Sequence, residues 1–254
     1  MSSYSFKTSG WPERLWRNNN AADIARGNVP GSVPFSAFGE KAVTGSGSSV
    51  VWQTGMPTTL TVPDNIQLTL VSTSASDIGN VTIKYLDGDL LERNEVVTLN
   101  GTTPVQTVAT DIRAINNAYS KFGPVNGTIT MTNGGVTYGQ MSAGDIQFHT
   151  SMIRVPANRR LMLAGIYAGS SSDSQGSSGS RVIVSLVTSF INGDSFAEQG
   201  YLHPLAAVAL QDTSATFPNF GPFPIPPGEW VGFKAKWSKA ADITAGYFGW
   251  FEDV

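Results

Sequence analysis

The sequence predicts an all-β protein, a jelly-roll-like β-sandwich with an extended N-terminal arm and at most one short helix. Three observations predict this class. Segments rich in β-branched and aromatic residues alternate apolar and polar positions, which is the pattern of half-buried strands. The 27 Gly and 14 Pro residues divide these segments at short intervals. A Pro-containing phrase followed by an alternating segment occurs three times, which is typical of chain reversals in sandwiches.

The expected strands follow one another along most of the chain. Each combines β-branched or aromatic residues with period-two alternation or with a short apolar run. The final aromatic stretch at 247–251 is expected to be a core strand. The other segments are residues 33–43, 50–54, 66–72, 81–86, 96–99, 105–108, 128–131, 136–138, 161–167 and 182–190.

Turn residues predict how several of these strands are connected. Asp87-Gly88, Asn100-Gly101 and Asn133-Gly134 each lie between two strand-like segments, and such pairs favour tight hairpin turns. The three Pro phrases begin at Val62, Val155 and Ile225. Their unequal spacing excludes a solenoid or a propeller, both of which need a fixed repeat.

Residues 111–122 are the one segment with helical spacing. Asp111 stands at an N-cap position, and the apolar residues that follow lie three or four positions apart, which predicts one short helix. These apolar residues are Ile112, Ile115, Tyr119 and Phe122.

The chain divides into an arm and a β body. Residues 1–32 are expected to be an N-terminal docking arm. Residues 33–150 and 151–254 are expected to be two sandwich halves or two domains, and the pattern leaves open which of these holds. The arm has four basic and two acidic residues and several aromatic ones. Aromatic side chains are costly to leave in water, so we expect the arm to dock on a neighbouring subunit or on its own body; the alternative is a frayed terminus. The docking residues are Tyr4, Phe6, Trp11, Arg14, Trp16 and Arg17.

Composition excludes several classes of protein. The absence of Cys excludes disulfide frameworks, thiol nucleophiles and zinc fingers. A net charge of −3 with scattered basic residues does not fit a nucleic-acid groove. No apolar run reaches the length of a membrane span, and the N-terminal residues lack the pattern of a signal peptide. The surface is instead expected to be rich in hydroxyl groups, because the chain has 27 Ser and 23 Thr residues.

Residues with catalytic or ligand-binding potential are few. His149 and His203 lie in no metal-binding motif, so we expect no metal, cofactor or catalytic residue. The acidic turn with Asp87, Asp89 and Glu92 could act as a calcium loop or as a glycosidase pair. Its acidic residues do not have the spacing of ligands in a calcium loop. Their adjacency in sequence also does not supply two carboxylates on opposite sides of a cleft, as a glycosidase pair needs. A structural turn balanced by Lys84 and Arg93 is the favoured interpretation.

Two further features bear on ligand binding. Trp52, Trp230 and Trp237 could form a sugar-stacking platform, although aromatic residues in strands more often face a core. The segment 170–180 has no apolar residue, which predicts an exposed loop. Chance matches explain the glycosylation sequons, since Asn, Ser and Thr are abundant.

Several phrases resemble a known family in the same order. Together they are similar to a family of virion structural proteins of tailed bacteriophages, of the type found in aquatic phages and cyanophages. The resemblance covers about residues 30–254 and implies no catalytic residue. Its phrases are VPFSAFGE at 33–40, LTLVSTSASD at 68–77, VTIKYLDGDLLE at 81–92, EVVTLNGTTPVQTVATDIRAIN at 95–116, IRVPANRRLMLAGIYAGSSSDS at 153–174, LAAVALQDTSATF at 205–217 and AGYFGWFEDV at 245–254.

The resemblance implies a non-enzymatic virion protein, assembled in the host cytoplasm. A capsid decoration (cement) protein or head-fibre protein, attached through the arm, is the favoured role. We expect its partners to be other capsid or tail proteins and further copies of itself, with a trimer as the first guess. The alternative is a tail fibre or receptor-binding protein that recognises host-surface glycan. A polysaccharide depolymerase with its site at the acidic turn is the least favoured hypothesis.

Overall fold

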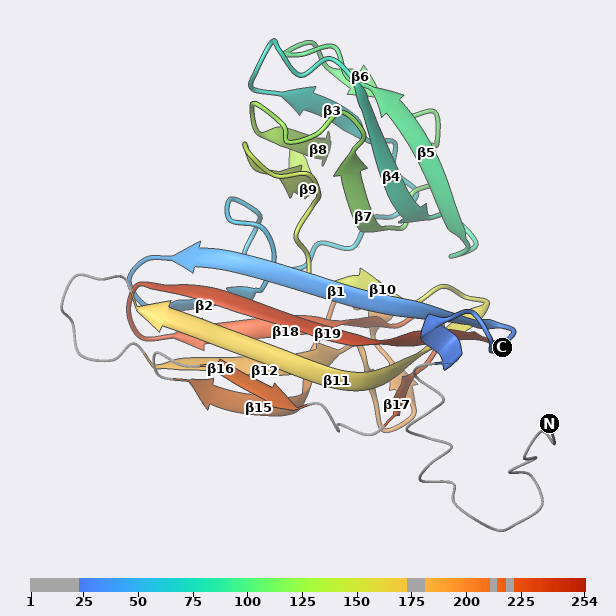
Figure 1. Ribbon diagram of the computed structural model, residues 1–254, viewed down its shortest axis with the longest axis vertical. Helices are drawn as coiled ribbons and strands as arrows, with labels where there is room; N and C mark the ends of the chain where they lie inside the picture. Colours follow the sequence, from blue (N-terminus) through green and yellow to red (C-terminus); the bar gives the residue numbers. More distant parts are fainter. Residues whose placement is uncertain (1–22, 173–180, 211–213, 218–221) are drawn as a thin grey trace, which may run out of the picture.

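The computed structural model describes residues 23–172, 181–210, 214–217 and 222–254, and in this part the chain is almost entirely β. The all-β prediction is therefore confirmed. Residues 23–25 are α-helical, and a single 3₁₀ turn, η2, covers Ala197–Gln199. No helix among the described residues is long and apolar enough to cross a membrane. The strands form two bodies, called here the base sandwich and the upper lobe (Figure 1).

The base sandwich consists of two antiparallel sheets. The first has the order β1-β19-β11-β16, with β17 also paired to β11, and its three long strands lie side by side in Figure 1. They are β1 (Ser32–Val43), β19 (Ala241–Asp253) and β11 (Arg159–Ser172), with the shorter β16 (Ser214–Phe217) and β17 (Phe223–Ile225). The second sheet has the order β10-β18-β12-β15, with β2 also paired to β18. Its strands are β2 (Gly47–Val50), β10 (Ile153–Arg154), β12 (Val182–Thr188), β15 (His203–Leu210) and β18 (Trp230–Trp237).

The alternation of β19 explains how the base sandwich forms its core. Tyr247 and Phe251 point inward and are buried with Phe233 and Leu163 between the two sheets. Neighbouring residues of a strand point to opposite faces, so Phe248 lies on the outer face and is partly exposed. The expectation that the aromatic C-terminal stretch is a core strand is confirmed.

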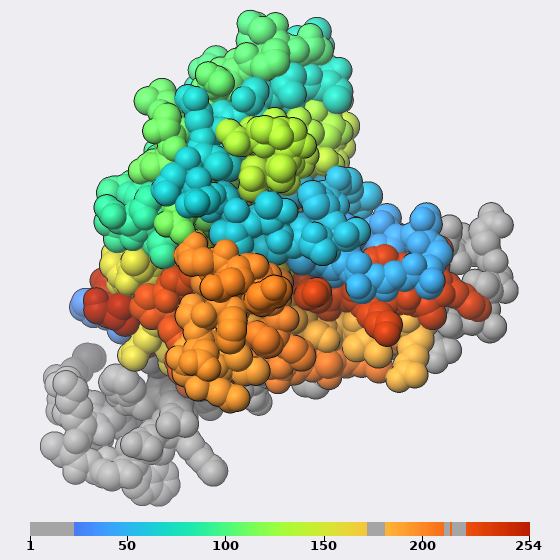
Figure 2. All heavy atoms as spheres, turned by 180° about the vertical axis from the view of Figure 1, so that it is seen from behind, coloured from blue at the N-terminus to red at the C-terminus, as the bar shows by residue number. Residues whose placement is uncertain are grey.

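The upper lobe also has two antiparallel sheets. One has the order β6-β3-β8-β9 and the other β5-β4-β7. The lobe stands on one side of the base sandwich in both views (Figures 1 and 2), and β1 is the long strand of the base that lies nearest to it in Figure 1. Its strands are β3 (Thr69–Ser72), β4 (Asn80–Leu86), β5 (Glu92–Thr98), β6 (Val105–Gln106), β7 (Ala114–Ser120), β8 (Ile129–Asn133) and β9 (Val136–Met141). A small hairpin of β13 (Phe190–Ile191) and β14 (Asp194–Ser195) completes the described strands.

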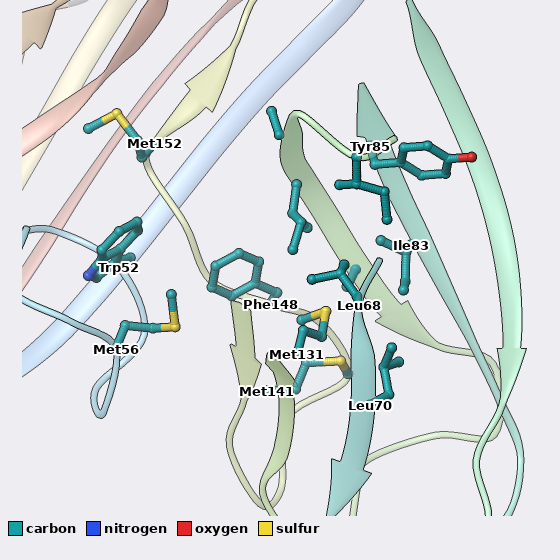
Figure 3. Close-up of a cluster of buried hydrophobic side chains, with 14 of the residues drawn as sticks. Trp52, Met56, Leu68, Leu70, Ile83, Tyr85, Met131, Met141, Phe148 and Met152 are labelled. Atoms are coloured by element: carbon teal, nitrogen blue, oxygen red, sulfur yellow. The ribbon is translucent and has the colours of Figure 1, made fainter. Parts of the chain in front are cut away.

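The core of the upper lobe continues into the base sandwich. Leu68, Ile83 and Met131 are fully buried in the lobe, and the same cluster includes Trp52 and Met152 from the segments that lead to the base (Figure 3). The two bodies therefore share the apolar cluster of the upper lobe, while a second cluster fills the space between the two sheets of the base sandwich.

The predicted helix at 111–122 is wrong, because this segment contains strand β7, which pairs with β4. The register shifts between Lys84 and Tyr85, so that Asn116 has no partner in the ladder. A β-bulge of this kind adds one residue and interrupts period-two alternation. Ile115 and Ala118, which lie on either side of this bulge, are both buried and three residues apart, which imitates the spacing of a helix.

Two connections also differ from expectation. Asn100-Gly101 does not join a hairpin, because β5 pairs with β4 whereas β6 pairs with β3 in the other sheet of the lobe. The predicted division at residue 150 likewise differs from the sheet arrangement. Strands β1 and β2 precede the upper lobe in sequence but pair with β19 and β18 of the base sandwich. By contrast, β4–β5 and β8–β9 are hairpins at the predicted turns.

Candidate functional site

The junction between the two bodies is formed by two of the predicted Pro turns. Pro156 follows β10 and Pro226-Pro227 follows β17, so both phrases lie between strands as expected. The turns also bond to each other, because the Gly228 N–H donates to the Val155 carbonyl at 2.9 Å. The Ala157 N–H donates to the carbonyl of Leu90 in the upper lobe, also at 2.9 Å. The Pro turns therefore connect the base sandwich to the lobe.

A buried arginine reinforces this junction. Arg154 is 1% exposed, its Nε donates to the Gly228 carbonyl at 2.8 Å, and its guanidinium lies over the ring of Trp230. It also pairs with Glu198, which in turn pairs with Arg113 of the upper lobe. Burial by itself raises the pKa of Glu198, but the bonds and charges of the two arginines outweigh it and lower that pKa. The carboxylate is thus held ionised between two cations, one from each body.

A cleft of about 340 Å³ lies between β1 and the upper lobe. Phe35 and Phe38 of β1 line one side, while Lys84 and Asn117 of the lobe line the other. The Asn117 side-chain oxygen is buried and has no hydrogen-bond partner. Aromatic surface next to amide and charged groups suits a polar ligand such as a sugar.

A cluster of three ionisable side chains lies beside this cleft. His149 packs edge-on against Phe38, with ring centroids 5.3 Å apart. Its Nδ1 is 2.8 Å from the Glu40 carboxylate, and one ligand atom each of Glu40, Asp145 and His149 lies within 4.8 Å of the others. Gln53 links the segments that carry them, since its side-chain amide donates to Asp145 and its side-chain oxygen accepts the backbone N–H of His149 at 3.1 Å. We call Glu40, Asp145 and His149 the junction triad.

The acidic turn is structural. Asp87 is buried, accepts the N–H groups of Asp89 and Leu91, and pairs with Arg93 at 2.7 Å. Burial by itself raises the pKa of Asp87, but these hydrogen bonds and the charge of Arg93 outweigh it, so that the pKa lies below its ordinary value. Glu95 accepts two backbone N–H groups, those of Val108 and Ala109. The carboxylates of Asp87 and Glu95 therefore hold the chain in place.

The remaining candidate residues for ligand binding or docking are buried, packed against a neighbouring ring or outside the described residues. Trp52, Trp230 and Trp237 are all buried, so the idea that they form an exposed sugar platform is wrong. The His203 ring packs at a tilt against Phe196, with ring centroids 5.2 Å apart. His203 forms none of the ion pairs found among the described residues. Residues 170–172 end β11, and the rest of the predicted 170–180 loop lies outside the described residues. So do the arm residues Tyr4, Phe6, Trp11, Arg14, Trp16 and Arg17.

The described end of the arm lies on the base sandwich. Ile24 is 2% exposed and borders an apolar groove of about 370 Å³ on the outer face of the β1-β19-β11 sheet. Ala164, Phe248 and Trp250 line the same groove, and Phe248 is 39% exposed. The root of the arm therefore packs on its own sandwich, next to exposed apolar surface.

Sequence reasoning missed the junction triad. The sequence predicts no ligand partner for His149, because Glu40 is more than a hundred residues away and the spacing of Asp145 and His149 matches no metal motif. The only available signal was that Asp145 and His149 are four residues apart, and this is weak without a helix. The pairing of β1 with the base sandwich supplies the third residue.

Comparisons with known proteins reveal only distant similarity. No family model matches the chain, and no curated protein matches its sequence. One solved structure, described as "Structure of infectious bursal disease virus Gt strain", matches with a TM-score of 0.25 and 11% identity, over 89% of this chain and 74% of that chain. Another, "Crystal structure of infectious bursal disease virus VP2 subviral particle", has a TM-score of 0.15 and 11% identity, over 87% and 77%. At these TM-scores the similarity supports no argument about fold or role.

Proposed function

We propose that this chain is a non-enzymatic structural protein of a virion, a capsid decoration or head-fibre protein that attaches through its N-terminal arm. The observation that carries the proposal is the root of the arm. Ile24 is anchored on the base sandwich beside exposed apolar surface at Phe248. The arm that precedes it carries four aromatic residues. A segment that is fixed to its own sandwich at Ile24 and is preceded by four aromatic residues suits attachment to a neighbouring subunit.

Two further observations support this role. The phrases between residues 33 and 254 resemble virion structural proteins of tailed bacteriophages. In addition, Asp87 of the acidic turn is engaged by backbone N–H groups and by Arg93, and Glu95 of β5 is engaged by backbone N–H groups, which leaves both carboxylates unsuited to acid–base catalysis.

Attachment would stabilise the particle by burying surface across joints between capsid subunits. A standard protein–protein interface buries about 1,600 Å² in total. Several arms of one oligomer would multiply their individual affinities through avidity. In this proposal a trimer binds the virion surface tightly, because its three arms each make a contact of moderate area.

The test is binding to capsids that lack this protein. A variant lacking residues 2–22 retains Ile24, so the base sandwich keeps its anchor while the arm is lost. We expect the amount of this protein bound to sedimented capsids to fall by about tenfold or more. The loss of even one buried aromatic anchor reduces the binding free energy by ~2 kcal/mol. A matched control keeps the arm and changes Ser2, Ser3, Ser5 and Ser9 to Ala. Occupancy equal to wild type in the deletion variant would refute attachment through the arm.

A second candidate is a tail fibre or receptor-binding protein that recognises host-surface glycan. The cleft between β1 and the upper lobe favours it, because Phe35 and Phe38 lie opposite the unpartnered Asn117 side-chain oxygen. Binding of wild type but not Asn117→Ala on a glycan array would support this role. Antibody labelling of intact virions separates the two candidates, since one places the protein on the head and the other on the tail.

A further inference from the structure

The junction triad brings together residues from both sides of the junction. Glu40 belongs to β1 of the base sandwich, whereas Asp145 and His149 belong to the segment that leaves the upper lobe between β9 and β10. Their ligand atoms lie within 4.8 Å of one another, and the His149 ring is held by Phe38. These contacts bring one imidazole and two carboxylates to one point on the path between the two bodies.

The charges of the junction triad are not balanced by basic residues. Among the ion pairs of the described chain, Glu40 pairs with His149 and Asp145 pairs with no Lys or Arg. Two carboxylates this close repel each other. A cation bound between them would remove the repulsion, and the partial exposure of all three residues leaves it a path from solvent.

We propose that Glu40, Asp145 and His149 bind one divalent transition-metal ion of the Zn²⁺ type. Zn²⁺ accepts imidazole nitrogen and carboxylate oxygen at about 2.0–2.2 Å, so its ligand atoms lie roughly 3.3 Å apart in tetrahedral geometry. The Glu40 side chain is 43% exposed and can rotate to close the remaining distance. Ca²⁺ and Mg²⁺ prefer sets of oxygen ligands, and the imidazole therefore selects against them.

The surroundings prepare the ligands for this role. The Gln53 side chain is bonded to the Asp145 carboxylate, to the Ser142 hydroxyl and to the backbone N–H of His149, so it holds one of the three ligands and the main chain that carries a second. Partners of this kind fix ligand geometry in metal sites. Glu40 lies on a strand paired along its whole length with β19. The bound ion would complete its coordination with water and would tie the upper lobe to β1.

The experiment is isothermal titration of the full chain with ZnCl₂, after chelator treatment and in a buffer that does not bind metal. We expect one Zn²⁺ per chain and a higher melting temperature of the loaded protein, because a ligand that binds only the folded state stabilises it. Glu40→Gln retains the size of the side chain and removes its charge, and it should weaken binding by about tenfold or more. CaCl₂ should give no saturable binding at the same concentration.

The second histidine provides the matched control. His203→Gln removes an imidazole that lies away from the junction triad, and it should bind Zn²⁺ as wild type does. His149→Gln serves as a second variant, with circular dichroism as the check that both triad variants are folded. The proposal is wrong if wild type binds no Zn²⁺, or if folded Glu40→Gln and His149→Gln bind it as tightly as wild type.

Discussion

At the scale of single residues, Asp77 illustrates how one carboxylate organises several loops. Its side chain is fully buried, and it accepts the Ser72 hydroxyl at 2.5 Å and the N–H groups of Asn126 and Gly127 at 2.8 and 2.9 Å. Burial by itself raises the pKa of Asp77, but these hydrogen bonds outweigh it, and the pKa lies below its ordinary value. The folded protein therefore favours the ionised form.

This lowered pKa predicts a dependence of stability on pH. The stabilisation is present above the unfolded-state pKa of about 3.9, and it is lost as the pH falls through the lower pKa of the folded state. Asp77→Asn should reduce the free energy of unfolding by about 1–3 kcal/mol at pH 7, and the deficit should shrink at pH 3. Urea denaturation at both pH values measures this.

The matched control is Asp89→Asn, because Asp89 is exposed in the turn between β4 and β5, at the other end of β4. It should change the free energy of unfolding by less than about 0.5 kcal/mol. An Asp77→Asn deficit that is equally large at pH 3 and pH 7 would contradict the role assigned to the ionised carboxylate.

At the scale of elements, β1 is the strand on which both bodies depend. It pairs along its whole length with β19, and its Phe38 lines the cleft below the upper lobe. Its path requires Gly39, because a Cβ there would lie 2.1 Å from the Val51 carbonyl oxygen and 2.8 Å from the Ser151 nitrogen. Both obstacles are backbone atoms and cannot rotate away.

Gly39→Ala should therefore displace β1 from the segments it crosses. We expect a loss of about 1–3 kcal/mol in the free energy of unfolding, as for other overpacked sites, measured by chemical denaturation. Ser36→Ala, at an exposed position of the same strand, is the control and should be nearly neutral. Wild-type stability of Gly39→Ala would mean that β1 does not approach Val51 so closely.

At the scale of the whole molecule, the apolar cluster of the upper lobe, which extends into the base sandwich, determines how the protein unfolds. Phe148 is 4% exposed and lies between the lobe residues Leu68 and Met131 on one side and Trp52 and Met152 on the other (Figure 3). Because apolar contacts continue from one body to the other, neither should unfold without exposing the surface of its neighbour.

We expect one calorimetric unfolding transition for the wild-type chain, with its van't Hoff enthalpy equal to its calorimetric enthalpy. Phe148→Ala should cost about 3–5 kcal/mol and separate the unfolding of the upper lobe from that of the base sandwich. Phe122→Ala, at a partly exposed position in the same lobe, should retain the single transition. Two resolved transitions in wild type would contradict the shared core.

Local pattern predicted much of the fold. The alternation in residues 33–43 and 81–86 matches β1 and β4, and the turns at Asp87-Gly88 and Asn133-Gly134 match two hairpins. These features depend on the φ and ψ preferences and side-chain faces of neighbouring residues. The same logic failed at 111–122, because a bulge that depends on pairing with β4 altered the apparent period.

The sequence by itself determined the β class, most strand positions and the aromatic core strand at the C-terminus. Only the tertiary structure decided that β1 and β2 complete the base sandwich, that the upper lobe is inserted between them and β10, and that Glu40 meets Asp145 and His149. The reason is physical. Strand periodicity depends on neighbours in the chain, whereas sheet order and the junction triad depend on contacts between residues far apart in sequence, which no local pattern encodes. The separation exceeds a hundred positions for β1 with β19 and for Glu40 with His149.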